Sequence, residues 1–244
     1  MDGIFSRVEL VAGPEKLEAF GRARVILFGV GGVGSWCAEG LVRSGVSHLT
    51  LVDSDVVSVT NINRQRMATT RTVGRPKVEA LRDMLLEINP DAQIETVRAV
   101  YSEKTAAGFD LDSYDYVVDA IDSLKDKSAL LLHAAASRAT LFSAMGAALK
   151  IDPTRVRVAE FWDVRGCPLA AAIRKKYRRA GTLPAKKFLC VYDDEVLPNR
   201  GDAPTEDMAS GSTSKAVING SLAHITAIFG FTLAGLILKD IYSA

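Results

Sequence analysis

The chain has few of the residues that form disulfide frameworks and zinc sites. Its 244 residues include three cysteines, Cys37, Cys167 and Cys190, and no two of them form a CxxC pair. This argues against a disulfide framework and a four-thiolate zinc site, and a reducing cytoplasm is the expected compartment. The first twenty residues carry charges throughout and contain no apolar run of the signal-peptide type.

Neither sign of charge is in excess. The chain has 30 lysine and arginine residues and 29 aspartate and glutamate residues, for a net charge of +1. Global charge therefore neither indicates nor excludes a nucleic-acid partner, and local clusters of cations must decide. Apolar residues make up 48% and charged residues 24%, as in ordinary soluble globular proteins. The length fits one large domain, or one domain with an appended subdomain.

Residues 216–238 form an apolar segment that is long enough to span a membrane. The segment contains polar residues near its start, including Asn219 and His224, and it has no basic cluster on either flank. A buried core helix is therefore the favoured interpretation, with a membrane-spanning helix as the alternative. We expect no stable association with a membrane.

Short apolar runs alternate with segments of helical length over the first 146 residues. The runs are rich in valine, leucine and isoleucine, as is typical of buried parallel strands. They cover residues 24–30, 48–53, 93–97, 114–120 and 141–145, and the helical segments cover residues 33–44, 76–89 and 123–138. This alternation predicts an α/β fold with a doubly wound, mostly parallel, Rossmann-like sheet.

The pattern changes in the rest of the chain, and we interpret residues 147–244 as a substrate-side extension of a core formed by residues 1–146. Residues 155–161 alternate like a half-exposed strand, and residues 168–181 predict a short basic helix that ends at a glycine. Residues 193–214 are polar and rich in proline, glycine and serine, which predicts a mobile loop. Since the apolar helix then returns to the core, the two parts are expected to form one compact domain.

The sequence GVGGVGS, residues 29–35, follows a predicted strand and opens a predicted helix. Its glycines match the G-x-G-x-x-G pattern, which lets backbone N–H groups approach phosphate oxygens at the positive end of a helix. The glycines are Gly29, Gly31 and Gly34, with Gly32 inside the turn. Asp53 ends the next strand, where a carboxylate can accept both ribose hydroxyls. These features predict a nucleotide site, although a glycine turn kept for packing is the alternative.

Polar residues that follow this acid favour ATP over NAD. They are Asn61, Arg64, Gln65, Lys77 and Asp122. A triphosphate carries about four charges and a bridging pyrophosphate about two, so ATP needs more cations and a metal ion. Arg64 and Lys77 could supply the cations, and Asp122 could hold Mg²⁺ through oxygen ligation. The alternatives are surface charges for the two cations and a helix N-cap for Asp122.

The ThiF/MoeB/HesA adenylating enzymes, relatives of ubiquitin-activating enzymes, are the family that this chain resembles. The resemblance rests on GVGGVGS, LVDSDVVSVTNINRQ, GRPK and DAIDS, which occur in the family's order within residues 7–146. The N-x-x-R-Q element is the specific part. Further similarity in DAIDSLKDK, KIDPTRVRV, PLAAAIRKK and IFGFTLAG extends over most of the chain. It indicates the branch of the family that acts on N6-threonylcarbamoyladenosine in tRNA.

The resemblance implies a role for each matching position. The implied catalytic residues are Arg7, Arg64, Lys77 and Asp122, and the implied nucleotide-binding residues are Gly29, Gly31, Gly32, Gly34, Asp53, Asp55, Asn61 and Gln65. Asp122 would hold Mg²⁺ near the α-phosphate. Arg7 would reach the ATP bound to the partner subunit, so the active unit would be a homodimer. A loose surface arginine is the alternative for Arg7.

Two substrate classes follow from the resemblance. In the first, ATP activates the threonyl carboxylate of the modified adenosine in tRNA, and an atom of the same modification closes a ring and expels AMP. In the second, ATP activates the C-terminal glycine of a ubiquitin-like sulfur-carrier protein. Such relatives often carry a CxxC zinc pair, which this chain lacks, so the tRNA substrate is favoured. A Rossmann oxidoreductase and a non-catalytic subunit are further alternatives, and a sulfur-transfer partner protein stays open.

The sequence RKKYRR, residues 174–179, favours tRNA because it places five cations and a tyrosine on one predicted helix of an otherwise neutral protein. Such a cluster can bind phosphates, and Tyr177 could stack on a base. The cations are Arg174, Lys175, Lys176, Arg178 and Arg179, and Arg138, Lys186 and Lys187 could extend the patch. A solvated helix face is the alternative.

Cys190 matches a cysteine position of these relatives. It could form a thioester with the adenylated substrate, or it could be a small apolar residue of a strand. Because ring closure within the substrate needs no enzyme thiol, the second interpretation is favoured.

Overall fold

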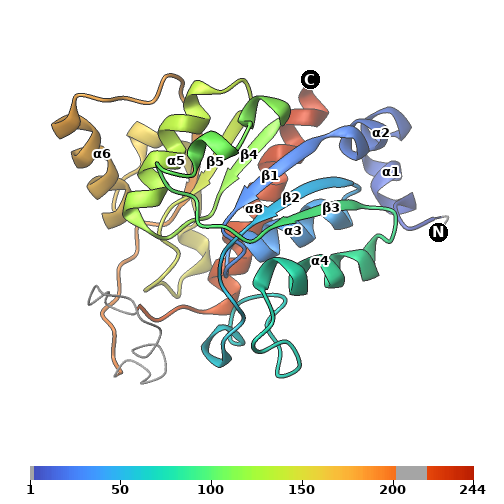
Figure 1. Cartoon of the computed structure of the whole chain (residues 1–244), viewed down its shortest axis with the longest axis horizontal. Helices are drawn as coiled ribbons and strands as arrows, with labels where there is room; N and C mark the ends of the chain where they lie inside the picture. Colours follow the sequence, from blue (N-terminus) through green and yellow to red (C-terminus); the bar gives the residue numbers. More distant parts are fainter. Residues whose placement is uncertain (1–2, 202–218) are drawn as a thin grey trace.

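A computed structural model describes residues 3–201 and 219–244 of the chain. These residues form a seven-stranded sheet with helices on both faces (Figure 1). The strand order is β3-β2-β1-β4-β5-β7-β6, and every neighbouring pair is parallel except β7 and β6. The strands are β1 Arg24–Phe28, β2 His48–Val52, β3 Gln93–Val97, β4 Tyr116–Asp119, β5 Thr140–Ala144, β6 Arg157–Glu160 and β7 Leu189–Tyr192. The prediction of a doubly wound, mostly parallel sheet is confirmed.

The helices agree with the sequence pattern except at the N-terminus, where two helices were not anticipated. The helices are α1 Ser6–Ala12, α2 Pro14–Arg22, α3 Gly34–Arg43, α4 Lys77–Ile88, α5 Leu124–Ala136, α6 Pro168–Ala180 and α8 Ala223–Ser243. The strands and helices predicted within residues 24–145 are all present, and their ends differ from prediction by at most two residues. The predicted glycine end of the basic helix is also confirmed, because Gly181 caps α6 in the left-handed conformation.

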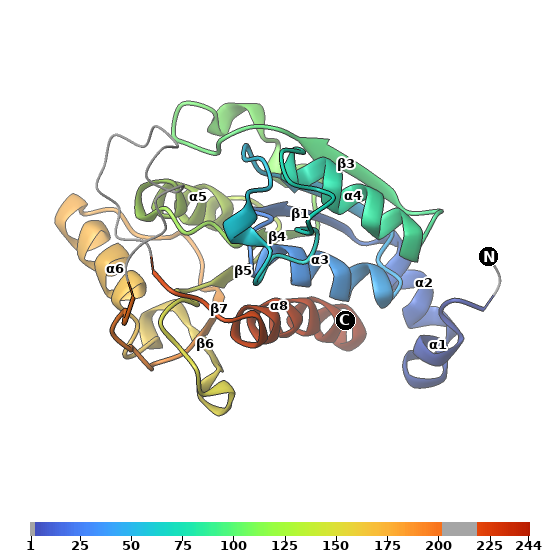
Figure 2. The ribbon, with the colours of Figure 1, turned by 90° about the horizontal axis from the view of Figure 1, so that it is seen from below.

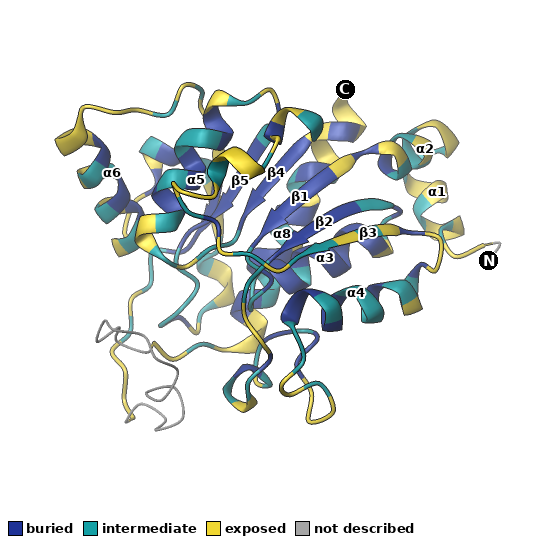
Figure 3. Ribbon diagram, viewed as in Figure 1, coloured by how far each residue is buried: buried dark blue, intermediate teal, exposed yellow. Residues whose placement is uncertain are grey.

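The central strands are apolar on both faces because helices cover both. Val25 and Leu27 of β1 lie in a core with α3, α4 and α8, whereas Ile26 and Phe28 lie in a second core with α5 and α6. Side chains alternate between the faces with a period of two, so covering both faces turns the strand into a continuous apolar run. Figure 3 shows this buried centre of the sheet.

Helix α8 packs along α3, as a core helix does. Phe229, Leu233 and Ile237 are buried in the first core, and the close approach of the two helices depends on a glycine. A Cβ atom added at Gly230 would lie 2.5 Å from the Val33 carbonyl oxygen. The predicted core helix is therefore confirmed, although it starts at Ala223 rather than residue 216. Within the described residues, α8 also has the length and apolar composition that could span a membrane.

The extension continues the sheet of the first part of the chain. β7 pairs with β5 in parallel, and β6 pairs with β7 in the opposite direction. Of the predicted mobile loop, residues 202–214 lie outside the described residues. Residues 193–201 have no helix or strand, but the Leu197 N–H donates to the Leu149 carbonyl at 2.9 Å, which ties this segment to the chain that follows β5.

Candidate active site

The predicted site residues gather where the carboxyl ends of β1, β2 and β4 meet. In the sheet, β2 lies on one side of β1 and β4 lies on the other. The connections that follow β1 and β3 therefore run in opposite directions, which leaves a crevice at the carboxyl end of β1. Ligands of doubly wound folds bind at such a point. It lies at the lower edge of the sheet in Figure 1, beside the loop that precedes α4, and Figure 2 looks toward this edge.

The turn between β1 and α3 requires glycine at positions 29 and 34. Gly29 has a φ of 85°, and a Cβ atom there would lie 2.7 Å from the Ala120 carbonyl oxygen. A Cβ atom at Gly34 would lie 1.9 Å from the Gly29 carbonyl oxygen. The hydroxyl of Ser35 donates to the Gly31 carbonyl at 2.7 Å, which fixes the turn at the start of α3. The turn therefore presents backbone at the positive end of a helix, where phosphate oxygens bind.

Asp53 lies beside this turn at the end of β2. Its Oδ2 accepts a hydrogen bond from the Val30 N–H at 2.9 Å, and its Oδ1 accepts one from the Asp55 N–H, also at 2.9 Å. Burial raises the pKa of Asp53, and the positive charge of Lys77 opposes this shift. Each carboxylate oxygen keeps a lone pair for a further donor, so the geometry fits the predicted ribose contact.

The N-x-x-R-Q element folds over the glycine turn. The side chain of Arg64 comes within 3.3 Å of the position that a Cβ atom on Gly32 would take, and its Nη1 donates to the Asn63 Oδ1 at 3.0 Å. Gln65 is buried beside Gly31, and among the described residues its Oε1 has no hydrogen-bond partner. Such a buried acceptor is costly unless a ligand satisfies it. Asn61 instead shapes the turn, because its Oδ1 accepts a hydrogen bond from the Ser58 N–H.

Helix α3 holds this element through contacts that the sequence did not predict. The indole N–H of Trp36 donates to the Arg64 carbonyl at 3.0 Å, and the Arg66 N–H donates to the Ser35 hydroxyl at 3.1 Å. The guanidinium of Arg66 lies over the Trp36 ring, 5.6 Å from its centroid, and pairs with Glu39. The glycine turn and the N-x-x-R-Q element are thus parts of one structure.

Lys77 and Asp55 form an ion pair at this edge. The Lys77 Nζ lies 2.8 Å from the Asp55 Oδ2, and the lysine side chain is nearly buried whereas the aspartate is exposed. The Lys77 N–H also donates to the Asp55 carbonyl at 2.9 Å. The alternative of a loose surface lysine is therefore wrong. Contact with a triphosphate stays a prediction, since that contact would require Lys77 to share its charge with Asp55.

Asp122 follows β4 and is exposed. The helix N-cap is Ser123, whose hydroxyl accepts from the Asp126 N–H, so the alternative of Asp122 as the cap is wrong. Within residues 3–201 and 219–244, the Asp122 carboxylate has no hydrogen-bond or ion-pair partner, and no three acidic, histidine or cysteine side chains cluster to hold a metal ion. A Mg²⁺ ion that takes one carboxylate and completes its shell with phosphate oxygens and water fits this arrangement.

Residues just before α8 and in its first turn lie against the glycine turn and the N-x-x-R-Q element, which the sequence did not predict. The Asn63 Nδ2 donates to the Ser221 carbonyl at 2.9 Å, and Thr226 comes within 3.2 Å of the Cβ position of Gly32. The Gly220 carbonyl accepts from the Leu149 N–H at 2.9 Å. The polar residues at the start of an apolar helix were the available sequence signal for this role.

The cations of α6 divide into inward and outward sets. Arg174 donates to the Phe161 carbonyl at 2.9 Å, and Lys176 donates to the Ser128 hydroxyl at 2.5 Å. Lys175, Arg178 and Arg179 are exposed. Tyr177 is buried and its hydroxyl donates to the Ser128 carbonyl at 2.7 Å, so the prediction that it could stack on a base is wrong. Lys186 also points inward, with its Nζ 2.8 Å from the Ser137 carbonyl oxygen, whereas Arg138 and Lys187 are exposed.

Two predicted residues lie apart from the others. Arg7 is exposed on α1, near the amino end of β1, so a single subunit does not bring it to the glycine turn. Cys190 is fully buried in β7, and burial raises the pKa of its thiol well above the usual range. A buried thiol with a raised pKa is a poor nucleophile.

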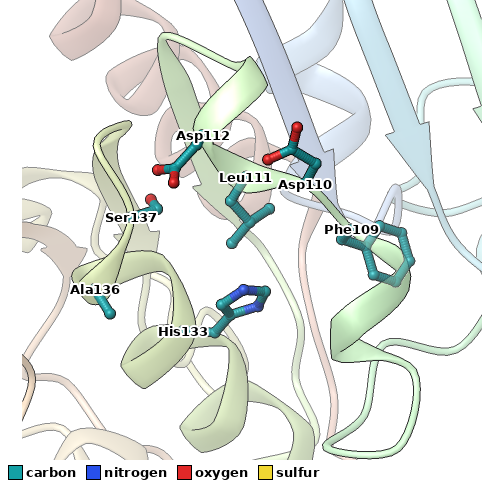
Figure 4. A pocket seen from close by; sticks show the side chains of 7 residues that line it. All are labelled: Phe109, Asp110, Leu111, Asp112, His133, Ala136 and Ser137. Atoms are coloured by element: carbon teal, nitrogen blue, oxygen red, sulfur yellow. The ribbon is translucent and has the colours of Figure 1, made fainter.

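A cavity of about 170 Å³ lies elsewhere, between the chain that precedes β4 and the end of α5. Figure 4 shows its lining, with the His133 ring at one side and the carboxylates of Asp110 and Asp112 at the other. The His133 Nδ1 is 2.8 Å from the Tyr101 hydroxyl oxygen. Because α5 begins at the carboxyl edge of the sheet and ends at the amino edge, this cavity is separate from the glycine turn.

Comparison with known proteins agrees with this geometry. The model of the ThiF family matches residues 5–243. A tRNA threonylcarbamoyladenosine dehydratase of Bacillus subtilis is 36% identical over 241 residues, which cover 97% of this chain and 94% of the relative. A molybdopterin-synthase adenylyltransferase of Escherichia coli is 35% identical over 150 residues, which cover 62% of this chain and 59% of the relative.

A solved structure gives the same result over the whole fold. The crystal structure of the E. coli tRNA N6-threonylcarbamoyladenosine dehydratase in complex with ATP has a TM-score of 0.86 and 31% sequence identity, and the match covers 98% of this chain and 93% of that one. The N-x-x-R-Q element, the glycine turn and the strand order thus occur together in a chain that matches the family model almost from end to end. The chain belongs to the ThiF family.

Proposed function

We propose that this protein is an ATP-dependent tRNA threonylcarbamoyladenosine dehydratase. One observation carries the proposal: the Arg64–Gln65 pair, the glycine turn and the exposed carboxylate of Asp122 lie at one edge of the sheet. This set suits a triphosphate and a metal ion better than a dinucleotide. Similarity to the dehydratases extends over nearly the whole chain, whereas similarity to the molybdopterin-synthase adenylyltransferase extends over 62% of it.

The proposed reaction has two steps. A threonyl carboxylate oxygen of the modified nucleoside attacks the α-phosphorus of ATP, and the bond to pyrophosphate breaks, which gives an acyl adenylate. An atom of the same modification then attacks the activated carbonyl, closes a ring, and expels AMP while its proton passes to solvent. The carboxylate oxygen leaves within AMP, so the nucleoside loses one water in total. No enzyme nucleophile is needed, in agreement with the burial of Cys190.

The chain's residues hold the reactants in line and offset negative charge. The backbone of the glycine turn would bind phosphate oxygens, and Asp53 would bind the ribose. Arg64 and Lys77 would supply positive charge along the triphosphate, with Asp55 keeping Lys77 in place at 2.8 Å. Gln65 would offer to a hydrogen-bond donor of the nucleotide its Oε1, which has no partner within residues 3–201 and 219–244.

A Mg²⁺ ion held by Asp122 is part of the proposal. When bound, it would neutralise charge on the phosphate oxygens during pyrophosphate release. The chain contributes the exposed carboxylate, and the Ser123 cap fixes the start of α5 directly behind it. The other ligands would come from ATP and water, as is usual for this ion.

The exposed cations of α6 form the proposed tRNA surface. Lys175 and Arg179 point to solvent, so both can contact phosphates. Replacing both by glutamine should weaken tRNA binding and lower its salt dependence, with a slope reduced by about two. The matched control replaces the exposed pair Arg98 and Lys104 by glutamine, which should leave binding unchanged. Equal weakening by the two double variants would contradict this surface.

A homodimer is also proposed, because Arg7 can join the site only from another subunit. The surface of α1 supports this, since Leu10 and Val11 are 86% and 84% exposed. Phe231 and Tyr242 add exposed apolar area on α8. A reducing cytoplasm stays the expected compartment.

The test compares AMP formation with modified tRNA, with tRNA lacking the threonylcarbamoyl group, and without RNA. The proposal expects AMP and pyrophosphate only with the modified tRNA. Turnover that needs a small ubiquitin-like protein and ignores RNA would support the sulfur-carrier alternative instead. Binding of NAD in place of ATP would contradict both.

A further inference from the structure

Two charged side chains are completely buried next to the candidate metal ligand. The Lys127 Nζ lies 2.7 Å from the Asp119 Oδ2, and both side chains have no exposed surface. Asp119 is the last residue of β4, and Lys127 lies in the first turns of α5. Burying two charges is costly, and a packed apolar pair at such a position is often equally stable. The pair therefore calls for a role beyond stability.

The pair holds the backbone of one residue, Ile121, at both its N–H and its carbonyl. The Ile121 N–H donates to the Asp119 Oδ1 at 3.1 Å, and the Lys127 Nζ donates to the Ile121 carbonyl at 2.8 Å. The Ser143 hydroxyl adds a hydrogen bond to the Asp119 Oδ2 at 2.6 Å, which anchors the carboxylate to β5. Ile121 immediately precedes Asp122. Its backbone therefore has a single orientation, set by the buried pair.

The residue after Asp122 is fixed as well. Ser123 caps α5 through its hydroxyl, which accepts from the Asp126 N–H and donates to the Asp126 carboxylate at 2.9 Å. The exposed Asp122 thus lies between two residues that are both held in place, Ile121 by the buried ion pair and Ser123 by its role as the helix cap. The backbone on both sides therefore sets the direction of the Cα–Cβ bond of Asp122.

We infer that the Asp119–Lys127 ion pair is a positioning device that aims the Asp122 carboxylate at the metal and the α-phosphate. The inference rests on the proposed function of Asp122. Because the Lys127 side chain is completely buried, it acts on the Asp122 loop through the Ile121 carbonyl and through Asp119. Outer groups that orient a metal ligand commonly change metal affinity or activity by about 10- to 100-fold when they are removed.

The experiment compares Lys127→Met with Leu130→Ala. Leu130 is a fully buried residue of the same helix that packs in the core and contributes no hydrogen bond to the Asp122 loop, so its variant controls for lost stability. The measurements are the Mg²⁺ concentration that gives half-maximal AMP formation, the maximal rate, and the amide hydrogen exchange of Ile121. We expect Lys127→Met to raise the half-maximal Mg²⁺ concentration or lower the maximal rate about 10-fold or more, and to speed exchange at Ile121. Leu130→Ala should leave the half-maximal Mg²⁺ concentration, the maximal rate and the exchange at Ile121 unchanged.

A second variant keeps the test decisive if the single change prevents folding. Asp119→Asn combined with Lys127→Met leaves no buried charge unpaired, so it should fold and still show the changed Mg²⁺ response. A normal Mg²⁺ response in this double variant, or in a folded Lys127→Met protein, would overturn the inference while leaving the proposed function intact. If Asp122→Asn itself keeps full activity, the proposed metal role fails, and the inference falls with it.

Discussion

Helix α8 approaches α3 at Gly230, and this contact yields a prediction with a built-in control. A Cβ atom at Gly230 would lie 2.5 Å from the Val33 carbonyl oxygen and 2.8 Å from the Cys37 nitrogen, both of which belong to backbone. Since Cβ atoms essentially never come closer than 3.0 Å to such atoms, the two helices must separate by about half an ångström. Gly235, one and a half turns later on α8, is exposed and has no atom within 4 Å of its Cβ position.

The two substitutions to alanine should therefore change the stability of the protein in opposite directions. Gly235→Ala should stabilise the protein by about 0.5–1 kcal/mol, because alanine loses less conformational entropy in a helix. Gly230→Ala gains the same propensity but forces overpacking, which costs roughly 1–3 kcal/mol or more, so a net loss is expected. Because Val33 and Cys37 lie at the start of α3, the displacement reaches the glycine turn, and the KM for ATP should also rise.

The assay is urea unfolding of both variants, together with ATP titration of AMP formation. We expect a lower unfolding midpoint and a higher KM for Gly230→Ala, and a raised midpoint with unchanged KM for Gly235→Ala. A Gly230→Ala protein that is as stable as the original chain would refute this expectation. That result would mean that α8 can move away from α3 at no cost.

Three further predictions concern single residues. Arg64→Ala should lower the rate of AMP formation about 100-fold or more, because a preorganised positive charge at the phosphates is lost; a change of less than threefold would remove Arg64 from the catalytic set. Cys190→Ala should keep turnover within about twofold, since the thiol is buried and burial raises its pKa; a trapped thioester on Cys190 would contradict this. Leu10→Glu should convert the proposed dimer to monomers in light scattering, because a charge at a residue 86% exposed in the single chain would be buried between subunits. A dimer unchanged by that substitution would locate the interface elsewhere.

Contiguous sequence patterns predicted the strands and helices of the first part of the chain correctly, and they predicted residues that the structure places at one edge of the sheet. The strands of the first part are continuous apolar runs because both faces of the sheet are covered, so run length alone located them. The glycine turn and the N-x-x-R-Q element are short segments whose spacing carries their chemistry. Their meeting in space follows from the doubly wound sheet, which the alternation of strands and helices predicts.

What the sequence did not predict depends on contacts between distant segments. The hydrogen bond from Asn63 to the Ser221 carbonyl joins residues 158 positions apart, and no local pattern indicates it. To predict the Asp119–Lys127 ion pair, one must know that Lys127 faces the core. The buried residues Leu130 and Leu131, at helical spacing from Lys127, were a signal for this.

The burial of Tyr177 was available from helical periodicity. Ala170, Ile173 and Tyr177 lie three and four residues apart and form the buried face of α6. The charged residues on both sides of the tyrosine favoured the interpretation that Tyr177 is exposed. A tyrosine on the apolar stripe of an amphipathic helix is more simply explained as a core residue with a bonded hydroxyl, which its hydrogen bond to the Ser128 carbonyl bears out.

In the proposed reaction, a carboxylate of the RNA is activated and AMP carries one of its oxygens away. Transfer of that oxygen can be followed with tRNA whose threonyl carboxylate carries a heavy oxygen isotope at both oxygens. After one turnover with ATP, we expect one labelled oxygen in the phosphate of AMP and a nucleoside lighter by one labelled water. Unlabelled AMP, or ADP in place of AMP, would contradict the proposed reaction.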